Sequence, residues 1–128
     1  MLDFRRKVHD GVSFDWNGQA IRFDDWADDE YGEFSYQTRD GAFDFFFDLQ
    51  PVDDQVRIYI LDQPSYDGRD NDGESTHRLM EHSGDYAGHH YVCVHRGLEP
   101  TNVPDALSWL VYWAEKTAEY IRTGKKFS

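Results

Sequence analysis

The chain has 128 residues, and its 25 acidic and 13 basic side chains give it a net charge of −12. Such a negative charge opposes binding to nucleic acid or to an anionic membrane surface, because both attract proteins through lysine and arginine. The single cysteine excludes an internal disulfide, and neither a signal peptide nor a membrane-spanning run is visible. We therefore expect one cytoplasmic domain, with a core built on the aromatic residues that make up 16% of the chain.

The first expected element is a β-hairpin over 11–24. Asn17-Gly18 is a strong signal for a two-residue turn, because both central positions of a type I′ turn need a positive φ. The register that follows pairs Phe14 with Ile21 on one side of the sheet. It places Asp15 on the other side.

A second hairpin is expected over 33–48, with its turn at Asp40-Gly41. One face of this hairpin is aromatic: it carries Phe34, Tyr36, Phe43, Phe45 and Phe47. The opposite face carries Asp44 and Asp48, and Phe46 is the one phenylalanine that falls among the acids. A slip by one residue would bury the carboxylates, so the register is strongly specified.

Three further strands are expected after the hairpins. The segment 55–62 alternates like a central strand, and a long loop rich in Gly, Asp and Asn follows it. The segments 76–80 and 89–96 read as two strands with their turn at 83–86. This register sends Met80, Val92 and Val94 to the core, and it turns His77, Tyr91, Cys93 and His95 outward.

The segment 103–124 is predicted to be a helix. Pro104 suits its first turn and Gly124 suits the position just after its end. Trp109 and Trp113 flank its apolar stripe and widen it. The predicted fold class is thus α+β: a single curved antiparallel sheet of about six to seven strands, covered on one face by one long C-terminal helix. One helix covers only part of so wide a sheet, so the remainder must curl, carry a lid or meet a partner.

Metal binding has two sets of candidate ligands. The loop 67–74 resembles a calcium loop but lacks two ligands of the EF-hand pattern, because Gly68 and Leu79 stand at their positions. Its acids could still hold a hard cation; they are Asp67, Asp70, Asp72 and Glu74. The second set is His77, Cys93 and His95, which would share one face of two adjacent strands and are competent zinc ligands. Solvated turns and strand faces are the favoured explanation of both sets, and no cofactor is predicted.

Catalysis has little support in the sequence. No glycine-flanked nucleophile or phosphate-binding loop accompanies Cys93 or Ser75. Paired acids such as Asp53-Asp54 lie near expected strand ends and should be solvated. An enzyme is therefore the less favoured class.

The acidic outer face of the sheet is the remaining candidate. An exposed aromatic residue ringed by acids is typical of a protein-binding surface. Charges on a sheet face also prevent aggregation, which is the alternative explanation. The predicted partner-binding residues are Asp15, Asp24, Trp26, Asp28, Asp29, Glu33, Asp44, Phe46 and Asp48.

Three hypotheses follow. The first is a small acidic module that occludes a basic protein, as an inhibitor, an immunity-type protein or a nucleic-acid mimic would. The second is a ligand-binding or metal-dependent enzymatic domain with its site near His77, Cys93, His95 and the loop 67–74. The third is a structural subunit of an assembly, and Trp109 with Trp113 could form a homodimer face.

Overall fold

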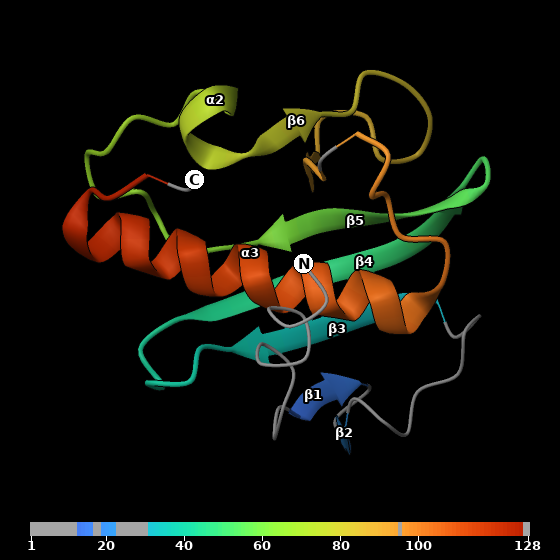
Figure 1. The fold of residues 1–128 in the computed structure, drawn as a ribbon, viewed down its shortest axis with the longest axis horizontal. Helices are drawn as coiled ribbons and strands as arrows, with labels where there is room; N and C mark the ends of the chain where they lie inside the picture. The colour runs from blue at the N-terminus through green and yellow to red at the C-terminus, as the bar shows by residue number, and fades with distance from the viewer. Residues whose placement is uncertain (1–12, 17–18, 23–30, 95, 127–128) are drawn as a thin grey trace.

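The computed structural model describes residues 13–16, 19–22, 31–94 and 96–126 (Figure 1). It confirms the predicted fold class: one antiparallel sheet packs against a long C-terminal helix. The strands follow the order β2-β1-β3-β4-β5-β7-β6. Their bounds are β1 Ser13–Trp16, β2 Gln19–Arg22, β3 Gly32–Gln37, β4 Asp44–Val52, β5 Gln55–Asp62, β6 Arg78–Met80 and β7 His90–Val92. The helices are α2, Gly73–Thr76, and α3, Val103–Thr123.

The predicted registers of both hairpins are confirmed where the structure describes them. Phe14 pairs with Ile21, and Phe34 pairs with Phe47. The outermost pairs predicted for the first hairpin involve 11–12 and 23–24, which lie outside the described residues. The second turn is wider than Asp40-Gly41 alone, because the Thr38 N–H donates to the Phe43 carbonyl at 2.9 Å.

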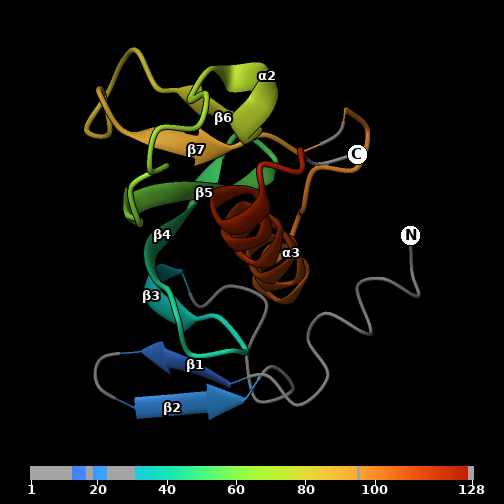
Figure 2. The same cartoon turned by 90° about the vertical axis from the view of Figure 1, so that its left-hand side faces the viewer.

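The core lies between the aromatic face of the sheet and α3. The helix α3 packs on that face and not on the opposite one (Figure 2). Phe45 and Phe47 are fully buried, and each meets the Trp113 ring edge-on, with centroids 5.8 and 6.0 Å away. The Trp113 indole N–H donates to the Thr76 carbonyl at 3.0 Å. This bond ties α3 to the end of the short helix α2 as well as to the sheet.

The hypothesis of a homodimer face at Trp109 and Trp113 does not fit this packing. The two side chains are only 7% and 2% exposed, so they belong to the core of the single chain. The apolar stripe of α3 is wide because it contacts more than the sheet: Trp113 reaches the end of α2. The same width buries Ser108, although its side chain is polar.

Both ends of α3 follow the sequence prediction. The Asn102 side chain accepts a hydrogen bond from the Asp105 N–H at 2.8 Å, which caps the first turn. Gly124 ends the helix with φ of 77°, in the left-handed region that glycine enters without steric cost. Among the described residues, no helix is both long and apolar enough to cross a membrane.

The far edge of the sheet departs from prediction in two places. Leu79 pairs with Tyr91, and Met80, which was expected in the core, is 38% exposed and does not reach it. Because β6 is the outermost strand, its last residue extends past the part of the sheet that the helix covers. The loop between β5 and β6 also contains α2, whose last turn closes at His77 with φ of 52°.

Candidate interaction surface

Phe46 is an exposed phenylalanine near the start of β4, the central strand of the sheet. Its side chain is 43% exposed, while Phe45 and Phe47 on either side of it are fully buried. The alternation of a strand sends neighbouring side chains to opposite faces, so Phe46 lies on the face that α3 leaves uncovered (Figure 2). Exposing a large apolar ring at the centre of a sheet is unfavourable in water, which makes Phe46 the natural centre of a candidate binding surface.

A β-bulge determines which residue lies beside Phe46. Phe47 pairs with Ile60, but Phe46 pairs with Asp62, so Leu61 is the extra residue of β5. Without the bulge, Leu61 would be the partner of Phe46 and would extend the apolar contact. The bulge instead places a carboxylate directly across from the exposed ring.

Acidic residues surround Phe46 on its other sides as well. Asp44 lies two positions along the same strand, and Glu33 lies on β3 two pairs from Phe46, opposite Asp48; both Asp44 and Glu33 are exposed. Ser35 pairs with Phe46 on the β3 side and with Asp15 of β1 on its own far side. We define the acidic patch as Phe46 with the exposed acids Glu33, Asp44 and Asp62.

Asp48 was expected to be one of the exposed acids, and the structure contradicts this. Its side chain is only 8% exposed. It accepts a hydrogen bond from the Tyr86 hydroxyl and another from the Gln50 amide at 2.8 Å. Burial, followed by the hydrogen bond to Asp48, raises the pKa of Tyr86 to about 12. The loop between β6 and β7 therefore covers this part of the outer face and bounds the acidic patch.

A second set of contacts holds the same loop against β5. The Tyr86 ring stacks on Tyr59, with centroids 4.1 Å apart. Glu81 accepts hydrogen bonds from the Tyr59 hydroxyl at 3.0 Å and from the Arg57 guanidinium at 2.7 Å. These donors, Tyr59 first, lower the pKa of the Glu81 carboxyl. The loop is thus held by stacking, by hydrogen bonds and by an ion pair.

Among the described residues, the candidate metal ligands do not gather into a site. Within the described residues, no group of three or more His, Cys, Asp or Glu side chains could hold one metal ion. His77 and Cys93 do lie on adjacent segments, because the Cys93 N–H donates to the His77 carbonyl at 2.8 Å, while His95 lies outside the described residues. The loop acids Asp67, Asp70 and Asp72 are exposed.

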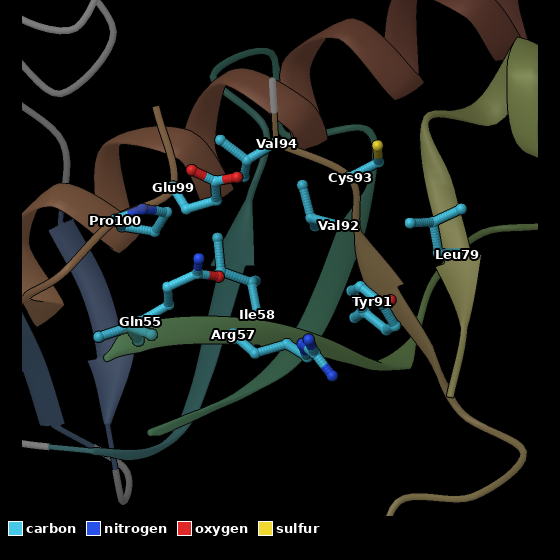
Figure 3. A pocket seen from close by; sticks show the side chains of 11 residues that line it. Gln55, Arg57, Ile58, Leu79, Tyr91, Val92, Cys93, Val94, Glu99 and Pro100 are labelled. Atoms are coloured by element: carbon cyan, nitrogen blue, oxygen red, sulfur yellow. The ribbon is translucent and has the colours of Figure 1, made fainter. Parts of the chain in front are cut away.

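A pocket of about 180 Å³ opens where β7 diverges from β5 (Figure 3). Ile58, Val92 and Pro100 form apolar walls, and Cys93 and Glu99 are among its polar lining residues. The volume is below the roughly 300 Å³ at which pockets usually begin to accommodate drug-sized ligands. Arg57, which also lines it, already stacks on the Tyr91 ring at 4.2 Å from the centroid. This pocket is therefore a weaker candidate than the acidic patch.

The other predicted partner-binding residues belong to the segment 23–30, which lies outside the described residues; they are Asp24, Trp26, Asp28 and Asp29. Sequence reasoning missed Asp62, because a bulge leaves no clear signal in the sequence. It also missed Tyr86, because an aromatic residue in a loop gives no sign of the strand that it will cover.

No protein-family model matches the chain, and neither a curated protein nor a solved structure matches it significantly.

Proposed function

We propose that this protein is a binding module that attaches to a basic protein through the acidic patch. The observation that supports the proposal most directly is the 43% exposed ring of Phe46, held on the central strand of the sheet between exposed carboxylates. An apolar anchor inside a charged rim is the usual composition of a protein-binding surface. The net charge of −12 adds a long-range attraction for a cationic partner.

Occlusion is the proposed mechanism. The carboxylates of Glu33, Asp44 and Asp62 would pair with lysine and arginine side chains of the partner, while Phe46 inserts as the apolar anchor. A basic surface covered in this way could no longer meet its own target, which is how an inhibitor or a nucleic-acid mimic acts. Because such exposed pairs are screened by salt, binding should weaken as ionic strength rises.

Capture from nuclease-treated lysate of the source cell tests the proposal. The test variant combines Phe46→Ala, Asp44→Lys and Asp62→Lys, all at exposed positions, so the fold should persist. Asp48 is left unchanged, because a lysine at that buried position would disrupt the contact with Tyr86. Nuclease treatment removes basic proteins that are held only through nucleic acid.

The matched control variant is Leu79→Ala, Asp54→Lys and Asp70→Lys. It makes the same change in net charge and also removes an exposed apolar side chain, but on other exposed parts of the surface. We expect a basic protein to be captured by the wild type and the control and lost with the test variant. Equal capture by all three proteins would contradict the acidic patch as the binding surface.

A further inference from the structure

The chemistry of the acidic patch points to arginine as the cation that it binds. This inference rests on the proposed function and makes its partner more specific.

The molecule already holds two arginines between an aromatic ring and a carboxylate, while Lys116 lies in a looser version of this setting, 5.9 Å from the Tyr112 centroid and 3.8 Å from Glu119. Arg57 lies over the Tyr91 ring, 4.2 Å from its centroid, and pairs with Glu81 at 2.7 Å. Arg122 lies over the Phe43 ring, 5.8 Å from its centroid, and pairs with Asp40. In both cases the guanidinium meets a π-face and an anion together, which are its two preferred kinds of partner.

The acidic patch repeats this combination of groups on the open face of the sheet. Asp62 is the cross-strand partner of Phe46, and such partners have Cα atoms roughly 4.5–5.5 Å apart. Asp44 lies two residues along β4, at about 7 Å. A guanidinium stacked on the Phe46 ring would therefore be within reach of either carboxylate.

Arginine satisfies this arrangement better than lysine. The guanidinium is planar, so it can stack on a ring and still donate hydrogen bonds from its edge to a carboxylate. It is also more weakly hydrated than an ammonium, so less water must be displaced at a half-exposed ring. We infer that the acidic patch binds an arginine side chain of the partner, stacked on Phe46 and paired with Asp62 or Asp44.

Two defined peptides test the inference. One repeats arginine and glycine, and the other repeats lysine and glycine at equal length and charge, so that long-range attraction is the same for both. Affinities are measured by calorimetry at low salt with wild-type protein. We expect the arginine peptide to bind about threefold more tightly, which is the size of an exposed cation–π contact.

Three variants test whether the acidic patch causes the preference for the arginine peptide. Phe46→Leu keeps an apolar side chain but removes the ring, and Asp62→Asn removes the carboxylate across from it; each should reduce the preference for arginine. Asp54→Asn removes one exposed charge from the turn between β4 and β5 and should leave the preference unchanged. Contacts between arginine side-chain protons and the Phe46 ring in nuclear Overhauser spectra provide an independent readout.

The inference is overturned by equal affinities for the two peptides, by a preference that survives Phe46→Leu, or by no measurable binding of either peptide. These outcomes are distinct from failure of the proposed function. A basic partner captured through the acidic patch, together with equal peptide affinities, would leave the function standing and reject arginine as its specific contact.

Discussion

The two faces of β4 give neighbouring phenylalanines opposite environments. Phe45 and Phe47 are fully buried under α3, and their rings contact Trp113. Phe46, between them in sequence, is 43% exposed, and its cross-strand partner on β5 is Asp62. The residue type is the same in all three cases, so the difference lies in what covers each face.

The outer face is itself divided. Around Asp48 it is covered by the loop that carries Tyr86, with hydrogen bonds and a stacked pair of tyrosines. Around Phe46 it is open and acidic. Polar residues on a sheet face can therefore contribute either to stability or to binding, depending on whether another segment covers them. The following predictions test this division.

The largest loss of stability should come from a change on the aromatic face of the sheet, which α3 covers. Phe47→Ala removes a fully buried ring that touches Trp113, and the cavity left behind should lower the free energy of unfolding by about 3–5 kcal/mol. Urea unfolding followed by tryptophan fluorescence measures this loss. A cost below about 1 kcal/mol would mean that the core repacks around the gap and that the two faces differ less than the structure indicates.

The next largest loss of stability should come from a change in the part of the outer face that the Tyr86 loop covers. Tyr86→Phe removes the hydroxyl that donates to buried Asp48 and leaves the carboxylate with the Gln50 amide. Loss of that donor should lower the free energy of unfolding by about 1–3 kcal/mol near neutral pH. Tyr31→Phe, at a residue that is 36% exposed, is the control and should be close to neutral. Equal effects of the two variants would contradict a structural role for the Tyr86 loop.

The same contact should respond to alkaline pH. The pKa of Tyr86 is raised from 10.0 to about 12 in the folded chain, so between these pH values the unfolded chain releases the proton more readily. Stability is therefore fully present below pH 10 and is lost as pH rises toward 12. Burial and the bond to Glu115 raise the pKa of Tyr36 too, so part of the loss will remain in Tyr86→Phe.

Urea unfolding at a series of pH values above 9 tests whether the free energy of unfolding falls as the pH rises. The stability gap between the wild type and Tyr86→Phe should narrow as pH rises through this range. A gap that stays constant would show that the Tyr86 hydroxyl does not hold its proton more tightly in the folded chain.

The open part of the outer face should matter least for stability. Phe46→Ala truncates a half-exposed ring and should change the free energy of unfolding by about 0.5 kcal/mol or less. Measured beside Phe47→Ala in the same urea series, it gives the sharpest contrast between the two faces. A cost comparable with that of Phe47→Ala would mean that Phe46 is part of the core, and the proposed binding surface would lose its basis.

Local patterns were enough to predict most of the fold. The hairpin registers follow from strand alternation, which would bury carboxylates if slipped by one residue. The ends of α3 follow from Pro104 and Gly124. The strand 55–62 was predicted to the residue because polar turn signals flank it.

The candidate surface was predictable only in part. Phe46 among acids follows from alternation alone, and its exposure agrees with that prediction. The burial of Asp48 and the position of Asp62 do not follow from alternation, because they depend on a loop that returns over the sheet and on a bulge. Such contacts between segments far apart in sequence leave no periodic trace in either segment.

The position of α3 at the end of the described fold has a consequence for synthesis. The strands that carry Phe34, Phe45 and Phe47 all leave the ribosome before the helix that covers them. Until residues 103–123 have emerged, the aromatic face of the nascent sheet lacks the helix that buries it. Chains stalled or cleaved before that point should therefore aggregate or bind chaperones, so synthesis of α3 is the step that protects the sheet from aggregation.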